Sequence, residues 1–228
     1  MPAILALPIA YLIGSIPSGW LVVRVATGKD VRAIESGRTG GTNAMRAAGF
    51  LAGLATGILD ILKGAAAVWV SKSIADGTDW MSAVSGLMAI IGHNYSAFLI
   101  EKGEDGKIRF KGGAGGATTL GAAIGLWAQS WMFILPFALI FYVVVGYASL
   151  TTISIAAAAM GVFLVRAIEG NDPWGYVVFG AAAVVIVVFA LRPNLQRLKK
   201  GTERRVNLIA RVFKTGEYKI LSIRPVGP

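Results

Sequence analysis

The chain has 228 residues, 55% of them hydrophobic and only 15% charged, and its formal net charge is +10. The stretches Trp131–Leu150 and Tyr176–Leu191 contain no charged side chain, which excludes an ordinary soluble domain and predicts an integral membrane protein. Cysteine is absent, which excludes disulfides, thiolate nucleophiles and cysteine-based metal sites.

Seven apolar segments are predicted to form membrane-spanning helices. In chain order they are Ala3–Val23, Ala48–Val70, Met81–Ile100, Ala117–Trp131, Met132–Leu150, Thr152–Ile168 and Trp174–Leu191. Met1–Ala3 contains no basic leader, so the first segment is expected to be a retained span rather than a cleaved signal. No strand or hairpin signal has comparable weight, and the expected fold class is all-α.

Two features of these predicted helices are unusual. Ala117–Trp131 is short for a hydrocarbon core that needs about 20 helical residues, so it either extends into the preceding glycines or forms a half-helix. Met132–Leu150 and Thr152–Ile168 follow each other without a polar loop. The chain is therefore expected to turn near Gly146–Thr152, where Gly, Ser and Thr gather.

Basic residues indicate which side of the membrane each loop faces. Residues 24–46 hold five basic and two acidic side chains, residues 101–111 hold four and three, and residues 192–228 hold ten and two. Because Lys and Arg favour the cytoplasmic side, we expect the N-terminus outside and the C-terminus in the cytoplasm.

This orientation divides the chain into a transmembrane domain and a tail. Residues 1–191 are expected to form the transmembrane domain, with cytoplasmic motif loops at 24–46, 101–116 and 146–152. Residues 192–228 are expected to form a basic cytoplasmic tail, whose charge suits contact with anionic lipid headgroups. No nucleic-acid binding is expected, because the topology already explains the basic excess.

The first predicted cytoplasmic loop has the composition of an anion site. It contains the run Glu35-Ser36-Gly37-Arg38-Thr39-Gly40-Gly41-Thr42-Asn43, followed by Arg46. Glycines let backbone N–H groups converge, a helix N-terminus attracts negative charge, and arginine binds phosphate with a planar fork. The candidate residues are Ser36, Arg38, Thr42, Asn43 and Arg46; the alternative is a flexible loop with a Thr or Asn helix cap.

A second glycine-rich segment, FKGGAGGATTLG at 110–121, repeats this composition. It lacks the full GxxxxGK[ST] pattern and is not a Walker loop. Its candidate phosphate-binding residues are Lys111, Gly112, Gly113, Gly115 and Thr118. Two such loops on one membrane face predict a protein that binds two phosphate-type groups, or one phosphate from two sides.

Three polar side chains fall in or near the predicted spans. His93 is the only histidine, and it is a candidate general base or phosphate ligand; the alternative is a hydrogen-bonded side chain between helices. One histidine without cysteine does not make an ordinary zinc site, so no metal is expected. Asp60 and Lys63, three residues apart on one helix, are expected to form a structural ion pair.

Taken together, these residues resemble the bacterial membrane family of acyl-phosphate:glycerol-3-phosphate acyltransferases. The matching residues are Gly14-Ser15-Ile16-Pro17, Ser36-Gly37, Thr42-Asn43, Arg46, Leu59-Asp60, Lys63-Gly64, Gly92-His93-Asn94, Phe110-Lys111-Gly112-Gly113, Gly115, Ala117-Thr118, Leu120-Gly121, Tyr147, Ser149-Leu150, Asn194, Arg197-Leu198 and Gly201-Thr202-Glu203. So many matches in order are not expected by chance.

The resemblance implies a seven-span enzyme of the bacterial plasma membrane. It would move a fatty acyl group from acyl phosphate to the 1-hydroxyl of glycerol 3-phosphate, giving lysophosphatidic acid and phosphate without a metal or other cofactor. It points to Ser36, His93 and Asn194 as candidate catalytic residues, and it adds Ser149 and Arg197 to the phosphate-binding set. Expected partners are the two substrates, membrane lipids and an enzyme that supplies acyl phosphate.

The chain departs from the family pattern at several positions. The family usually has Asn followed by Ile or Val where this chain has Arg38-Thr39, and it usually has lysine and Val where this chain has Ala114 and Gly116. It usually has histidine at the position of Leu191, and Pro193 also differs. The insert Glu101–Arg109 looks longer than usual. These losses are expected to weaken phosphate binding unless Arg38 replaces the charge. The alternatives are a divergent, weakly active paralogue or scaffold of lipid synthesis, and a transporter of an anionic metabolite.

Overall fold

The structure is a computed structural model that describes residues 3–75, 77–103 and 105–205. The α-helices and strands are α1 (Ala6–Ser15), α2 (Ser18–Thr27), α3 (Gly41–Ala48), α4 (Phe50–Ile74), α5 (Asp79–Asn94), β1 (Ile100–Lys102), β2 (Ile108–Phe110), α6 (Gly116–Leu126), α7 (Trp131–Val145), α8 (Ala148–Ile168), α9 (Trp174–Ala190) and α10 (Arg192–Lys199). Three short 3₁₀ helices, η1 (Ala3–Leu5), η2 (Val31–Ala33) and η3 (Ala128–Ser130), complete the described elements.

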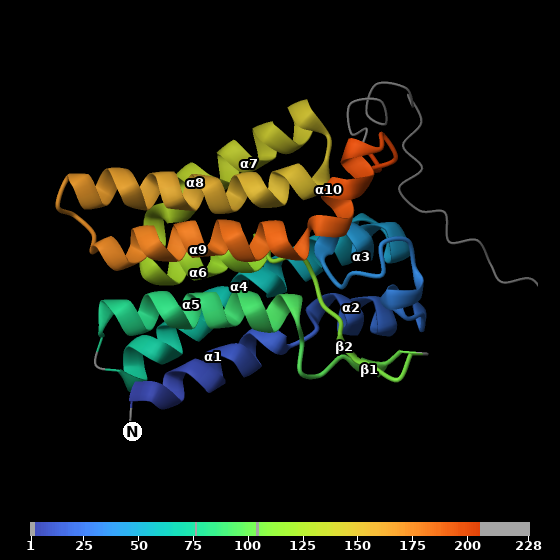
Figure 1. Ribbon diagram of the computed structural model, residues 1–228, viewed down its shortest axis with the longest axis horizontal. Helices are drawn as coiled ribbons and strands as arrows, with labels where there is room; N and C mark the ends of the chain where they lie inside the picture. Colours follow the sequence, from blue (N-terminus) through green and yellow to red (C-terminus); the bar gives the residue numbers. More distant parts are fainter. Residues whose placement is uncertain (1–2, 76, 104, 206–228) are drawn as a thin grey trace, which may run out of the picture.

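The predicted helical membrane bundle is confirmed. Among the described residues, four helical segments are long and apolar enough to cross a membrane, namely Ala3–Thr27, Phe50–Ile74, Ala128–Val145 and Ala148–Ile168. A fifth span results if Trp174–Ala190 and Arg192–Lys199, which meet at a 64° bend, are taken as one. The remaining predicted segments correspond to α5, with 16 residues, and α6, with 11. In Figure 1, α5 lies between α1 and α9, and α6 lies behind α9.

The short helix α6 packs directly on α4. A Cβ atom on Gly64 would overlap the carbonyl oxygen of Thr118, and one on Gly121 would overlap the carbonyl oxygen of Ile61. Small residues let membrane helices approach this closely, because lipid supplies no hydrophobic force that drives helices together. Leu120 on α6 is buried in the main apolar cluster, so the short helix lies in the interior and its first turn has a fixed position.

The expectation of no strands is wrong for residues 100–110. β1 and β2 form an antiparallel hairpin in which Ile100 faces Phe110 and Lys102 faces Ile108. The missed signal was the turn pair Asp105-Gly106, where Gly106 has a φ of 75°, between short stretches of alternating polarity. The predicted third span therefore ends early, since α5 stops at Asn94.

The predicted turn between the fifth and sixth apolar segments is confirmed. α7 ends at Val145, Gly146 takes a left-handed conformation with a φ of 75°, and α8 begins at Ala148. Glycine adopts this conformation without the steric cost of a side chain.

The connections that carry the predicted motifs gather at one end of the bundle. Figure 1 shows α2, α3, the hairpin and α10 together at that end, and the N-terminus at the opposite end. The backbone N–H of Thr39 donates to the carbonyl of Gly112 over 3.2 Å, so the first loop and the glycine-rich segment lie side by side.

Candidate active site

A cavity of about 500 Å³ opens where these connections meet. One part of its wall is polar and charged, with Ser36, Arg38, Thr42, Asn43, Arg46, Asp60, His93, Ser149, Asn194, Arg197 and Glu203. Another part is apolar and comes from α7 and α8, with Leu135, Ala138, Leu139 and Ile155. A wall of this kind suits a molecule with a charged head and a hydrocarbon chain.

Most of the predicted site residues line this cavity, although they come from five separate parts of the chain. Those on its wall are Ser36, Arg38, Thr42, Asn43, Arg46, His93, Gly115, Ser149, Asn194 and Arg197. Lys111, Gly112, Gly113 and Thr118 do not line it. Gly115 has a φ of 93° and caps α6, so the first turn of α6, with its unpaired N–H groups, lies against the cavity.

Lys111 differs from its predicted position as a phosphate counter-charge. Its Nζ lies 3.7 Å from Oε2 of Glu101, and its side chain is 41% exposed. Lys111 comes directly after β2, and its side chain points toward Glu101 on β1 rather than into the cavity.

Gly112 and Gly113 pack closely against the end of α5. A Cβ atom on Gly113 would overlap Nε2 of His93, and one on Gly112 would overlap the carbonyls of His93 and Asn94. The N–H of Gly113 donates to the carbonyl of His93 over 2.9 Å. These glycines allow the segment to press against the end of α5, and thereby hold His93 in place.

Arg38 crosses from the first loop to two distant elements. Its Nη1 donates to the carbonyl of Gly113 over 2.8 Å, and its Nη2 donates to that of Ala190 over 2.5 Å. No acidic partner is within ion-pair distance of Arg38 in the described part of the chain. Burial, and next the nearby Arg197, lower the pKa of its guanidinium, which is the behaviour of a cation short of counter-charge.

The two departures from the family pattern flank this arginine. Ala114 follows Gly113, Leu191 follows Ala190, and both Ala114 and Leu191 line the cavity. Arg38 therefore binds the residues that precede Ala114 and Leu191, the two positions where the family resemblance led us to expect lysine and histidine.

Asn43 organises the loop that carries Arg38. Its Nδ2 donates to the carbonyls of Val31, Ile34 and Arg38 over 3.0, 2.9 and 2.9 Å. One buried amide thus closes residues 31–43 into a fixed shape, in place of a simple helix cap.

Asp60, Lys63 and His93 form a buried cluster below the cavity. The predicted ion pair is confirmed, with Asp60 Oδ1 2.8 Å from Lys63 Nζ. The same carboxylate oxygen lies 3.5 Å from His93 Nδ1, and Lys63 also donates to the carbonyl of Ile16 over 2.7 Å. Asp60 and His93 also line the cavity.

Glu203 was not among the predicted site residues, yet it connects three of them. Its carboxylate accepts hydrogen bonds from Ser149 Oγ over 3.2 Å, Asn194 Nδ2 over 2.8 Å and Arg197 Nε over 2.9 Å. The available signal was its place as a lone acid in a basic stretch. Next to it, Arg204 pairs with Glu35 of the first loop. Within the described residues no cluster of His, Cys, Asp and Glu could hold a metal ion.

Comparisons with known proteins agree on one family. The family profile described as Glycerol-3-phosphate acyltransferase matches residues 4–201. The chain is 40% identical to Glycerol-3-phosphate acyltransferase 2 of Moorella thermoacetica, over 89% of this chain and 97% of the relative. It is 36% identical to Glycerol-3-phosphate acyltransferase of Thermus thermophilus, over 90% of this chain and 95% of the relative.

Two solved structures have the same fold. Both are of PlsY (YgiH), an integral membrane glycerol 3-phosphate acyltransferase, one in the glycerol 3-phosphate form and one in the lysophosphatidic acid form. The TM-scores are 0.78 and 0.75, the identities are 28% and 29%, and each match covers 93% of this chain and all of the other.

Proposed function

This chain belongs to the glycerol-3-phosphate acyltransferase family, and we propose that it moves a fatty acyl group from acyl phosphate to the 1-hydroxyl of glycerol 3-phosphate. The products are lysophosphatidic acid and inorganic phosphate. The fold similarity to PlsY structures in the glycerol 3-phosphate and lysophosphatidic acid forms supports this acceptor and this product.

The observation that carries the choice of donor is the mixed wall of the cavity. Arg38 and Arg46 bring positive charge to it, while Leu135, Leu139 and Ile155 form its apolar side. Acyl phosphate is an amphiphile with an anionic head, and glycerol 3-phosphate is a soluble dianion, so one cavity of this kind suits both. A larger donor such as acyl-CoA carries a bulky nucleotide, and among the described residues of the wall Tyr142 is the only aromatic side chain on which it could stack.

The proposed reaction needs no nucleophile from the protein. The 1-hydroxyl oxygen attacks the acyl carbonyl carbon, the bond from that carbon to the phosphate oxygen breaks, and phosphate leaves with the electron pair. The hydroxyl proton passes to an acceptor. Because a mixed anhydride is already activated, catalysis requires alignment of the two reactants and stabilisation of negative charge.

We assign roles to the cavity residues on this basis. Arg38, Arg46 and Arg197 neutralise phosphate, with hydrogen bonds from the hydroxyl groups of Thr42 and Ser149 and from the first turn of α6. Ser36 and Asn194 orient the acceptor hydroxyl, and Asn194 has a buried Oδ1 without a partner among the described residues. His93, next to Asp60, is the candidate proton acceptor. Asn43 holds the loop, and Lys111, Gly112, Gly113 and Thr118 act from outside the cavity.

We also propose seven spans in a bacterial plasma membrane, with the N-terminus outside and the C-terminus in the cytoplasm. The separation of the N-terminus from the motif-bearing end supports this orientation (Figure 1). Residues 1–191 form the transmembrane part and 192–228 the tail, whose first residues, Asn194 to Arg204, contribute to the cavity. An enzyme that makes acyl phosphate is the expected partner.

The test is an assay of the purified protein in lipid nanodiscs with palmitoyl phosphate and radiolabelled glycerol 3-phosphate. We expect labelled lysophosphatidic acid and phosphate in equal amounts. Palmitoyl-CoA and palmitoyl acyl carrier protein serve as control donors. Product from either control but not from palmitoyl phosphate would overturn the donor, and binding of glycerol 3-phosphate without product from any donor would favour the scaffold alternative.

A further inference from the structure

The β1–β2 hairpin has one apolar and one polar face. In an antiparallel pair, residues opposite each other point to the same face, and faces alternate along each strand. The observed register puts Ile100, Phe110 and Ile108 on one face together with Lys102. The other face carries Glu101 and Arg109.

The apolar face is the one that is exposed. Ile100 is 53% accessible, Ile108 68% and Phe110 45%. Phe98, just before β1, is 58% accessible. Four large apolar side chains within thirteen residues are therefore left largely uncovered by the described part of the chain.

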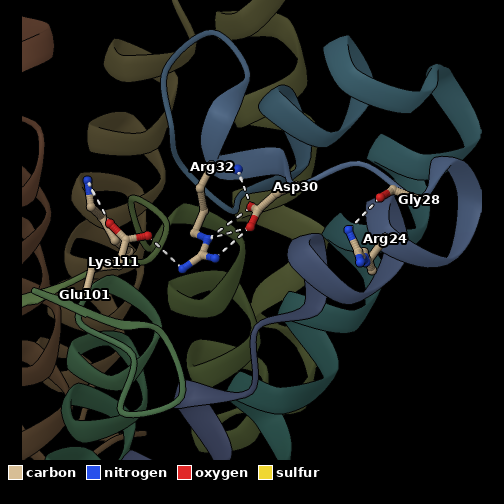
Figure 2. A network of polar contacts seen from close by, with 6 residues as sticks. All are labelled: Arg24, Gly28, Asp30, Arg32, Glu101 and Lys111. Carbon is tan, nitrogen blue, oxygen red and sulfur yellow. Dashed lines mark hydrogen bonds and ion pairs between the residues drawn. The ribbon is translucent and has the colours of Figure 1, made fainter.

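On the polar face, Glu101 binds the rest of the protein, whereas Arg109 is exposed and pairs with Asp105 in the turn of the hairpin. Arg32 of the first loop donates from Nη1 to Glu101 Oε1 over 2.7 Å, and it also pairs with Asp30 over 2.6 Å. Lys111 approaches the other oxygen of Glu101. Figure 2 shows this network between the first loop and the hairpin, with Arg32 at its centre.

Exposed apolar side chains on a hairpin that is attached through a polar residue are unfavourable in water. An antiparallel sheet in water packs its apolar face on the protein and exposes its polar face, because apolar surface left in water costs free energy. A lone two-stranded hairpin is moreover marginally stable in water. A hairpin that is attached to the protein through Glu101 and leaves its apolar side chains exposed is therefore suited to an apolar surrounding.

We propose that the apolar face of the β1–β2 hairpin enters the lipid–water interface and anchors this end of the bundle to the membrane. The membrane is the occupant because other apolar side chains at the same end of the bundle are also exposed. Figure 1 shows α2 at this end, and Leu21 and Val25 on α2 are exposed. Lys102, on the apolar face, can extend its stem along the lipid and place its ammonium among the headgroups.

The anchor has a consequence for the cavity. Glu101 binds Arg32, and Arg32 belongs to the loop whose following residues, Ser36 to Arg46, line the cavity. Through this link the level of the membrane surface sets the position of the loop. The inference rests on geometry and on membrane insertion, and does not require the proposed reaction.

Because the natural chain contains no cysteine, single-cysteine variants give a direct test. Ile108→Cys and Ile100→Cys place a nitroxide label on the apolar face, and Arg109→Cys places the matched control label on the polar face of the same hairpin. Each labelled protein is reconstituted into nanodiscs of phosphatidylethanolamine and phosphatidylglycerol. Collision of the label with oxygen, which concentrates in lipid, is compared with collision with a water-soluble nickel chelate.

We expect oxygen accessibility to exceed nickel accessibility for the labels at 108 and 100, and the reverse at 109. The two apolar-face variants check each other, since a locally unfolded hairpin would make all three labels accessible to nickel. Equal nickel accessibility at 108 and 109 would overturn the proposal. Dipolar broadening at 108 that disappears on dilution with unlabelled protein would also overturn it, because a second copy would then be the occupant.

Discussion

At the residue scale, we propose that Arg38 supplies a positive charge at a site where the motif has changed. Its guanidinium uses two N–H groups on the carbonyls of Gly113 and Ala190, and this leaves further donors for a ligand. Burying an arginine without an acidic partner lowers the stability of the fold unless a bound anion neutralises its charge. The phosphate of a substrate is the anion that the cavity would admit.

A double-mutant cycle tests whether Arg38 replaces the lysine expected at position 114. Arg38→Ala should lower kcat/KM by roughly tenfold to a hundredfold, since a charged hydrogen bond contributes about 1.5–3 kcal/mol. Ala114→Lys should change the parent little but partly rescue Arg38→Ala, with a coupling of about 0.5–3 kcal/mol. The measurement is KM and kcat for glycerol 3-phosphate in the parent, both single variants and the double variant.

Arg24 offers the matched control for that cycle. It also donates to a carbonyl, that of Gly28 over 2.6 Å, but it does not line the cavity (Figure 2). Arg24→Ala should leave kcat/KM near that of the parent. If Ala114→Lys alone lowers KM strongly while Arg38→Ala is neutral, the chain has lost a contact and Arg38 does not compensate for it.

Arg46 and Lys111 should now differ, although both were predicted to bind phosphate. Arg46 lines the cavity, whereas Lys111 pairs with Glu101 outside it. Arg46→Ala should reduce kcat/KM by roughly tenfold to a hundredfold. Lys111→Ala should stay within about fivefold of the parent, because an exposed ion pair contributes at most about 1 kcal/mol. Equal losses in the two variants would contradict the assignment of the cavity as the phosphate site.

At the element scale, the close contact between the glycine-rich segment and α5 determines the shape of the site. The segment touches the end of α5 through Gly112 and Gly113, and α6 starts immediately after it with Gly115 as its cap. Helices α4 and α6 are close for the same reason, at Gly64 and Gly121. Glycine here acts mainly through the absence of a side chain.

Gly113→Ala tests this account against a second glycine of the cavity region. The added methyl would meet the imidazole of His93, and relieving the overlap should cost about 1–3 kcal/mol. We expect a lower melting temperature in detergent and a large loss of kcat. Gly40→Ala is the control, because a Cβ at Gly40 meets nothing within 4 Å although this residue also lines the cavity. Equal melting temperatures for the two variants would show that His93 is not held by this contact.

At the scale of the whole molecule, the cavity and the motif-bearing loops lie at one end of the bundle. The first loop, the hairpin and α10 lie at this end, and the N-terminus lies at the opposite end (Figure 1). A soluble dianion and a membrane-borne donor can both reach a cavity located there. From the charge pattern of the loops we propose that this end faces the cytoplasm.

Reporter fusions test this topology. Fusions at Lys29, Lys107 and Lys214 should report a cytoplasmic location, and fusions at Asp76 and Asp172 should report the outside. The physical reason is the excess of Lys and Arg in the loops of the first group. A cytoplasmic signal at Asp76 or Asp172 would contradict the seven-span orientation. Lys214 and Asp76 lie outside the described residues, so their locations depend on the topology alone.

Local properties of the sequence determined the helices and most of the residue types of the site. Apolar length predicts a span because hydrophobicity sums along the chain, and the i, i+3 spacing of Asp60 and Lys63 predicts their pairing because helix geometry is regular. The hairpin escaped prediction because its strands are three residues long, and so short a pattern is a weak signal.

Tertiary structure alone decided which of the predicted residues meet. Arg38 reaches carbonyls that lie 75 and 152 residues away, and Glu203 joins Ser149, which is 54 residues away, to Asn194. Lys111 has the right chemistry and a neighbouring position, yet it points to Glu101. Such contacts depend on how whole helices pack and on the direction of each side chain, and neither is encoded in the spacing of a motif.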